Sequence, residues 1–158
     1  MPAEGALPAE VLLALHHAVS QWSDVQRTRA EQIADKYRDL REGRHPPLSN
    51  AQLSGILAYL TSQEKWADQK RFVRHQGEKA DKAERRDNLS DFWKDLEQAG
   101  DTLQQKDAKT VWAQTLEAAG EAGKEFNPNK PPDMVHQLLL REFVQHLVSH
   151  ALYLSTKG

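Results

Sequence analysis

The sequence contains no cysteine among its 158 residues. This absence excludes a disulfide framework, a thiolate zinc site and a cysteine nucleophile, and it favours a reducing compartment. No apolar run approaches the roughly 20 residues that a membrane-spanning helix needs. The N-terminal segment carries Glu4 and Glu10, where a secretory signal peptide would be basic. We therefore expect a cytoplasmic protein without a membrane span.

Motifs of the common enzyme classes are also missing. The sequence has no GxSxG nucleophile turn, no GxGxxG dinucleotide loop and no GxxxxGK[ST] phosphate loop. The charged helical segments contain many carboxylate pairs, but such pairs carry no information about acid–base chemistry when they are this frequent. We expect no catalytic residues, no cofactor and no enzymatic activity.

No segment alternates polar and apolar positions under β-branched residues, so strands are not expected. Apolar residues recur at helical spacing instead, and the content of 39% hydrophobic and 28% charged residues is ordinary for a soluble globular protein. The length fits one domain over residues 1–158 with its own core. The sequence therefore predicts an all-α protein, a compact bundle of about five helices.

The first half of the chain contains two predicted helices. The first covers residues 8–40, either as one long helix or as two with a break near Ser23. The second begins at Asn50, because Ser49 and Gln52 can form a capping box just before an apolar periodic segment. It is expected to run to Gly77, a residue type that favours helix C-termini.

A further helical segment is predicted to begin at Asn88. The pair Gly100-Asp101 is expected to interrupt it, and the helix that follows is expected to end near Gly120 or Gly123. Three of the four tryptophans have apolar neighbours at helical spacing and are predicted to lie in the core. They are Trp22, Trp93 and Trp112.

The proline-rich segment 127–132 is predicted to be a loop, and the last helix begins at Pro132 or Asp133. This helix is apolar on more than one side, which is typical of a central helix or of one with a second face for a partner. Glu142, His146 and His150 share one of its faces, a spacing that a metal ion can use. The alternative is that all three are polar surface positions.

Charge is unevenly distributed along the chain. The net charge is −2, but residues 65–86 contain eight Lys/Arg and four Asp/Glu, a local charge of +4. Such a basic segment on a nearly neutral protein is a candidate face for a polyanion, and the alternative is a solvated helix surface. Trp66 lies one turn before Lys70, where it can stack on a base or pack in the core.

Three short segments together resemble a known family. Residues 48–53 (LSNAQL) match a leucine-then-Ser/Thr helix start, residues 72–79 match an aromatic–small–Gly–basic segment through Gly77 and Lys79, and residues 143–153 match a closing helix rich in aromatic and alanine residues. In these segments the chain resembles the small helical subunit of type III CRISPR effector complexes, particularly the type III-A (Csm) version. The related small subunits of type III-B and of other multisubunit CRISPR complexes are comparably helical and are equal alternatives.

The chain departs from this family in two places. Ser54 stands where the family usually has Arg, and residues 87–129 form a longer insert than the family has. The resemblance implies a non-catalytic subunit for antiviral defence, which stacks in copies along a ribonucleoprotein beside other subunits and holds the guide–target RNA backbone. The main alternative is a helical protein–protein adaptor that binds no nucleic acid.

The basic segment supplies the expected nucleic-acid-binding residues, because Lys and Arg at helical spacing neutralise phosphates without recognising sequence. The primary candidates are Lys70, Arg71, Arg74 and Lys79, and the secondary ones are Lys82, Arg85 and Arg86, with Trp66 as the candidate for stacking.

Overall fold

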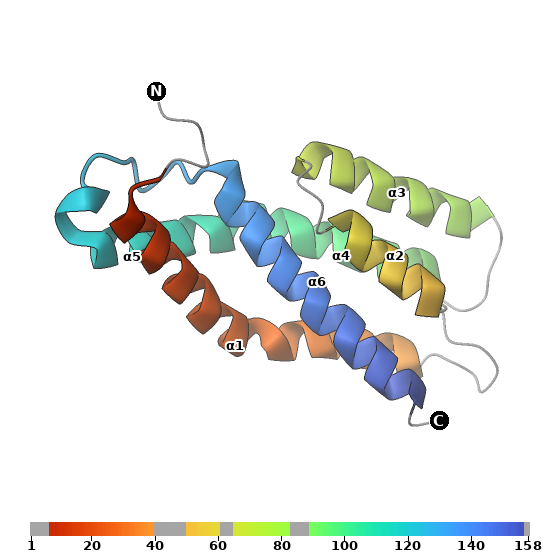
Figure 1. Ribbon diagram of the computed structural model, residues 1–158. Coiled ribbons are helices and arrows are strands. Elements are labelled where there is room, and N and C mark those ends of the chain that lie inside the picture. The colour runs from red at the N-terminus through yellow and green to blue at the C-terminus, as the bar shows by residue number, and fades with distance from the viewer. Residues whose placement is uncertain (1–6, 40–49, 61–64, 83–88, 157–158) are drawn as a thin grey trace.

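The computed structural model describes residues 7–39, 50–60, 65–82 and 89–156. All the regular structure in these residues is helical, which confirms the predicted all-α class (Figure 1). The helices are α1 (Ala9–Asp39), α2 (Asn50–Leu60), α3 (Trp66–Lys82), α4 (Leu89–Thr102), α5 (Ala108–Ala119) and α6 (Asp133–Thr156). A π-helical turn (Leu103–Asp107) joins α4 to α5, and a short 3-10 turn (Gly120–Gly123) follows α5.

The junction between α4 and α5 does not change the direction of the chain. Thr102 and Ala108, which flank the π-helical turn, both have ordinary α-helical backbone angles. Therefore α4, the turn and α5 form one continuous rod, and the described residues make up five helical rods, as predicted. Of the two alternatives for residues 8–40, the structure has the single unbroken helix.

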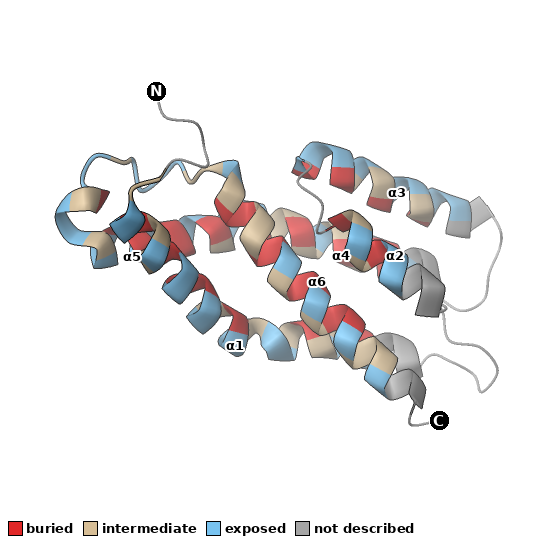
Figure 2. Cartoon of the chain, in the orientation of Figure 1, coloured by how far each residue is buried: buried red, intermediate tan, exposed pale blue. Residues whose placement is uncertain are grey.

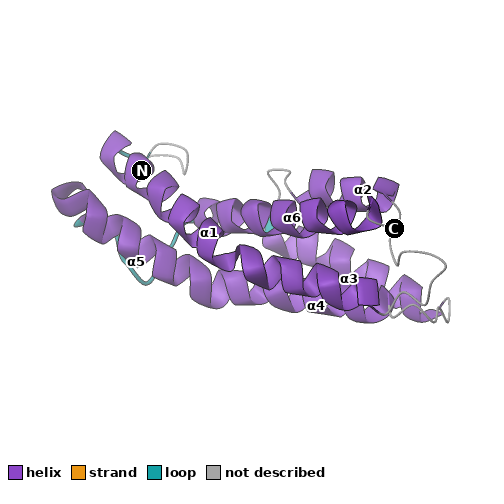
Figure 3. Cartoon of the chain, turned by 90° about the horizontal axis from the view of Figure 1, so that it is seen from below, coloured by secondary structure: helices purple, strands orange, loops and turns teal. Residues whose placement is uncertain are grey.

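The rods are arranged around α6. Helices α1 and α6 lie side by side and run in the same direction, and the α4–α5 rod runs in the opposite direction (Figures 1 and 3). Helix α2 packs on α6, while α3 packs on α4 at the outer edge of the molecule (Figure 1). Among the described helices, none combines the length and the apolarity needed to cross a bilayer.

The core consists of two apolar clusters. The larger lies among α2, α3, α4, the second half of α1 and the second half of α6. The smaller lies among the first half of α1, α5 and the start of α6. Trp22 packs against both clusters, and α6 supplies buried residues to both, so its several apolar sides are used inside the bundle (Figure 2). Trp93 and Trp112 are buried as predicted.

The predicted helix from Asn50 to Gly77 is wrong beyond its start. Helix α2 begins at Asn50 but ends at Leu60, where the buried Gln69 side chain donates a hydrogen bond of 3.3 Å to the terminal carbonyl. Helix α3 then runs past Gly77, which is buried against α4 rather than at a helix end. A Cβ atom at Gly77 would lie 3.3 Å from the Cβ of Trp93. The predicted cap residue Ser49 lies outside the described residues.

The predicted interruption at Gly100-Asp101 is also wrong. The helix continues through both residues, and they form part of the surface against which Trp66 packs. A Cβ atom at Gly100 would overlap the Trp66 ring, and the Asp101 carboxylate accepts a hydrogen bond from the Trp66 indole N–H at 2.9 Å. The predicted end of the helix is confirmed, since α5 ends at Ala119 and Gly120 has a φ of 62°. The predicted loop over 127–132 and the start of α6 at Asp133 are confirmed too.

Candidate nucleic-acid interface

Helix α3, which carries most of the predicted binding residues, has two different sides. Its inner side packs on α4 through buried Val73 and Gly77, and its outer side faces solvent, as the pale-blue segments in Figure 2 show. Helical periodicity separates the predicted cations between these two sides. The side on which each cation lies decides whether it is available to a polyanion.

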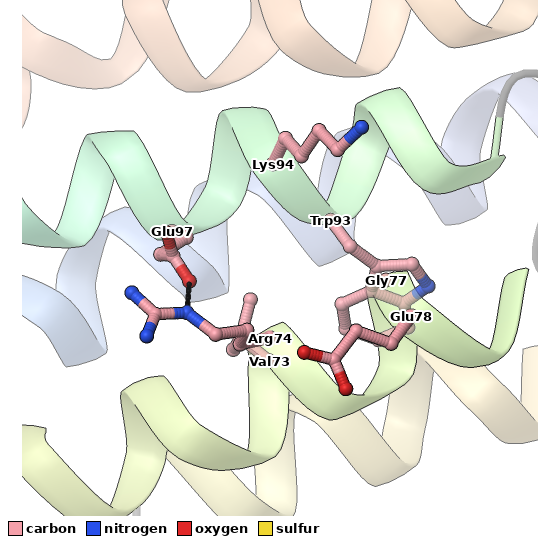
Figure 4. Close-up of a pocket in the computed structure, with 7 residues that line it drawn as sticks. All are labelled: Val73, Arg74, Gly77, Glu78, Trp93, Lys94 and Glu97. Carbon is pink, nitrogen blue, oxygen red and sulfur yellow. Dashed lines mark hydrogen bonds and ion pairs between the residues drawn. The ribbon is translucent and has the colours of Figure 1, made fainter. Parts of the chain in front are cut away.

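Lys70 and Arg74 lie on the side of α3 that faces α4. The Lys70 ammonium is 2.9 Å from the Asp101 carboxylate. The Arg74 Nε is 2.9 Å from the Glu97 carboxylate, as Figure 4 shows. Their side chains are 31% and 58% exposed, so they are not buried, but each is paired with an acid of the same molecule. The hydrogen bond and the charge of Glu97 raise the pKa of Arg74. These two cations attach α3 to α4 and are not a strip of unpaired charge.

The Arg74–Glu97 bridge borders a pocket of about 240 Å³ between α3 and α4 (Figure 4). Lys94 also lines the pocket, and the Trp93 ring lies beside Gly77 (Figure 4). The pocket contains charges of both signs and is bounded by the residues that hold the two helices together. It therefore belongs to the α3–α4 contact.

Trp66 is 5% exposed and belongs to the larger apolar cluster. Its indole N–H donates to Asp101, the same carboxylate that Lys70 contacts. Burial by itself would raise the pKa of Asp101, but the hydrogen bonds from Lys70 and Trp66 lower it below its ordinary value. This burial corrects the expectation that Trp66 stacks on a base, since its ring is covered by protein.

The outer side of α3 presents three basic side chains at intervals of four residues, which we call the outer strip: Arg71, His75 and Lys79. All three are exposed. Arg71 is 81% exposed, and its ion pair with Asp68 is long, at 3.9 Å. Lys79 makes no ion pair with the residues that the structure describes. Arg71 and Lys79 are thus the predicted cations that the fold leaves pointing to solvent, and His75 was missed.

The remaining predicted cations extend the same segment. Lys82 is the last residue of α3, and its side chain lies outside the part of the chain that the structure describes. Arg85 and Arg86 lie outside the described residues. Of the seven predicted cations, two pair with acids on α4, two belong to the outer strip, and the side chains of the other three lie outside the described residues.

A hollow of about 670 Å³ opens beside the outer strip, between α2 and α3. It is lined by Tyr59, Asp68, Arg71, Phe72 and His75. Tyr59 and Phe72 stack with ring centroids 4.2 Å apart and an angle of 24° between the rings. The sequence prediction missed both aromatics. An indication was present in the sequence, because helical spacing places Tyr59 on a different face of α2 from Leu57 and Leu60.

The buried imidazole of His136 contacts both Trp66 and the backbone at Gly100. It is 4% exposed, its Nε2–H donates to the Gly100 carbonyl at 3.0 Å, and its ring meets the Trp66 ring edge-on at 5.4 Å. Burial lowers the pKa of His136 below its ordinary value of 6.5, against weaker raising effects of the Gly100 hydrogen bond and of the charges on Asp133 and Asp101. His136 is therefore neutral in the folded protein at neutral pH.

This burial predicts a loss of stability in mild acid. As the pH falls through 6.5, the unfolded chain protonates His136 while the folded chain resists protonation until a lower pH. The unfolded state then binds more protons, so the free energy of unfolding decreases with decreasing pH. Well above pH 6.5 the residue is neutral in both states, so it adds no pH dependence to the free energy of unfolding. His136→Gln keeps an N–H donor for Gly100 but cannot titrate, so its urea-unfolding midpoint should fall less on acidification than that of the parent. Equal falls in the two proteins would show that His136 titrates normally.

His146 and His150, which share a face of α6 with Glu142, make two separate contacts with α1. His146 shares a hydrogen bond of 2.7 Å with Ser23, and His150 lies 2.9 Å from the Asp35 carboxylate. In the part of the chain that the structure describes, no three His, Cys, Asp or Glu side chains are grouped so that they could hold a metal ion. These histidines therefore connect α6 to α1.

Comparisons of the chain with protein-family models, with curated proteins and with solved structures returned no match. The resemblance to small subunits of CRISPR effectors therefore remains a prediction from short sequence motifs. The structural features that bear on function are the outer strip and the adjacent hollow between α2 and α3.

Proposed function

We propose that this protein is a non-catalytic, RNA-binding subunit of a cytoplasmic ribonucleoprotein in antiviral defence, similar in role to the small subunit of type III CRISPR effectors. The observation that supports the proposal is the outer strip of α3, in which Arg71, His75 and Lys79 face solvent on one side of a helix at the edge of the bundle. The partners would be RNA, other subunits and further copies of the chain.

The spacing of the outer strip suits a sugar–phosphate backbone. Four residues of α-helix rise about 6 Å, which is of the order of the separation between successive phosphates of an RNA strand. Arg71 and Lys79 carry fixed charge, and the His75 imidazole offers an N–H donor in either protonation state. Contacts of this kind position a nucleic acid and release counterions, but they do not recognise sequence. A protein that holds many different guide–target pairs needs contacts of this type.

The inner pair, Lys70 and Arg74, has a supporting role in this proposal. Each is bound at 2.9 Å to an acid on α4. Ion pairs that remain partly exposed to water contribute little to stability, so these two orient α3 more than they stabilise the fold. By holding the inner side of α3 against α4, they keep the outer strip directed away from the bundle.

RNA retention during purification tests the proposal directly. The full chain, expressed in a cell and purified at low salt, should carry RNA that is visible in its ultraviolet spectrum and is removed by ribonuclease or by high salt. Reconstitution with short synthetic RNA should restore the complex. A protein that purifies free of RNA, and does not bind added RNA at low salt, would contradict the proposal.

A protein–protein adaptor is the second candidate, and two exposed apolar side chains on α1 favour it. Leu13 is 74% exposed and Val25 is 72% exposed, so both side chains are available for contact with a partner. The adaptor predicts a protein partner that survives nuclease treatment and is lost when Leu13 and Val25 are both changed to Lys. If the partner remains bound to that variant, α1 is not the adaptor surface.

A further inference from the structure

We infer that the hollow between α2 and α3 binds an unpaired nucleobase of single-stranded RNA, stacked on the aromatic pair formed by Tyr59 and Phe72. The inference rests on the proposed function and makes its ligand more specific. It assigns to Tyr59 and Phe72 the stacking role that the sequence suggested for Trp66, and it places this role next to the outer strip.

The geometry of the aromatic pair supports this site. Tyr59 and Phe72 are both half-buried and lie nearly parallel, with ring centroids 4.2 Å apart. Phe72 also meets the buried Trp93 edge-on at 6.3 Å, which ties the pair to the core. Packing of this kind fixes the rings before a ligand arrives, so less conformational entropy is lost on binding. Aromatic rings stack on any base, because every base has a π face.

The charges around the hollow favour a nucleotide over an apolar ligand. Arg71 and His75 line the hollow and also belong to the outer strip, so a base in the hollow would have its phosphates beside these side chains. Asp68 lines it as well and lies 3.9 Å from Arg71. In addition, the Asp68 carboxylate can accept a hydrogen bond from the amino or imino groups of a base. Cations and aromatic rings next to one another are typical of single-strand binding surfaces.

The size of the hollow is consistent with such a ligand. Its volume of about 670 Å³ is larger than one nucleobase, and the hollow is open to solvent. A base pair inside a duplex cannot enter it, because both faces of each base are already stacked on neighbours. The aromatic pair should therefore give the protein a preference for single-stranded RNA over duplex RNA. The outer strip should contribute to the binding of both kinds of RNA.

Tyr59→Leu tests the inference, because leucine keeps apolar bulk but removes the ring. Against a labelled oligouridine of about 15 nucleotides, affinity should fall by roughly 5- to 150-fold, the range expected for the loss of one base–aromatic stack. Affinity for a fully paired RNA duplex should change less than about twofold. Tyr59→Phe keeps the ring and should bind the oligouridine as the parent does. Thermal melting of all three proteins would verify that they are folded.

Cross-linking gives a second readout that does not depend on a variant folding correctly. An oligouridine that contains 4-thiouridine, irradiated with the parent chain, should attach to peptides that contain Tyr59 or Phe72. Cross-links that map only to other helices would overturn the inference.

The outcomes separate this inference from the proposed function. If Tyr59→Leu binds both RNAs as the parent does, or loses affinity for both equally, stacking in the hollow is wrong while RNA binding stands. If the parent binds neither RNA at low salt, both the inference and the proposed function are wrong. Loss of single-strand affinity alone, with rescue by Tyr59→Phe, supports both.

Discussion

The double substitution Arg71→Glu/Lys79→Glu is expected to weaken single-stranded RNA binding by about 25-fold or more at about 0.1 M salt. Each phosphate contact on a single strand releases about 0.7 of a counterion, so the loss of two contacts makes the negative slope of log affinity against log salt less steep by about 1.4. Charge reversal adds repulsion to this loss. Fluorescence anisotropy with labelled RNA at several salt concentrations measures both quantities.

The chain offers a matched control for this experiment. Arg141 on α6 and Lys109 on α5 are both exposed, and their joint change to Glu alters the net charge by the same amount. This control should bind RNA nearly as the parent does, because its charges lie outside α3. An equal loss in both double variants would show that total charge, and not the outer strip, determines RNA binding. Both variants should retain the helicity of the parent, since none of the four side chains is buried.

Gly100→Ala is expected to destabilise the protein by about 1–3 kcal/mol, the cost of inserting a methyl group into a well-packed core. The new Cβ would overlap the Trp66 ring, which is itself held by Asp101 and by the edge of His136. A loss of stability would point to the contact with Trp66, because helix propensity alone favours alanine over glycine by about 1 kcal/mol. Urea unfolding of the parent and the variant measures the difference.

Two further variants show whether the cause is the contact with Trp66. In a Trp66→Leu background the ring is absent, so adding Gly100→Ala should be neutral or stabilising by up to about 1 kcal/mol. Gly55 in α2 is exposed, and a Cβ atom there would have no neighbour within 4 Å, so Gly55→Ala should stabilise the parent by about 0.5–1 kcal/mol. If Gly100→Ala destabilises equally with and without the Trp66 ring, the proposed packing is wrong.

The helices were predictable wherever a local signal determined them. The apolar period of α1 and the prolines before α6 mark long segments, and Gly120 ends α5 with a positive φ of 62°, a backbone conformation that glycine adopts readily. These features depend on neighbours within a few residues of the chain. Their prediction therefore needs no knowledge of which helices pack together.

The predictions at Gly77 and Gly100 were wrong because a glycine can either end a helix or allow another side chain to pack closely against it. Local rules interpret a glycine in a helical pattern as an end or a break. In this protein the missing Cβ instead lets Trp93 approach Gly77 and lets Trp66 approach Gly100. The contacting tryptophans lie far away in sequence, so only the packing of α3 on α4 reveals why glycine is needed.

The site was only partly predictable for the same reason. The sequence locates a basic helix, but the pairing of Lys70 with Asp101 and of Arg74 with Glu97 joins residues more than twenty positions apart. Those acids lie after residue 86, outside the basic segment 65–86. Helical phase places Arg71 only about 60° from Arg74 and about 100° from Lys70, so it does not show which of these cations contacts an acid on α4.

The salt dependence of RNA binding by the unmodified chain tests the central claim most directly. Anisotropy of a labelled single-stranded RNA should show binding at low salt, with an affinity that falls steeply and linearly on a log–log plot as salt rises. Two or three phosphate contacts on the outer strip predict a slope of about −1.4 to −2. No binding at low salt, or binding whose affinity does not change with salt, would contradict the assignment of α3 as an RNA-backbone interface.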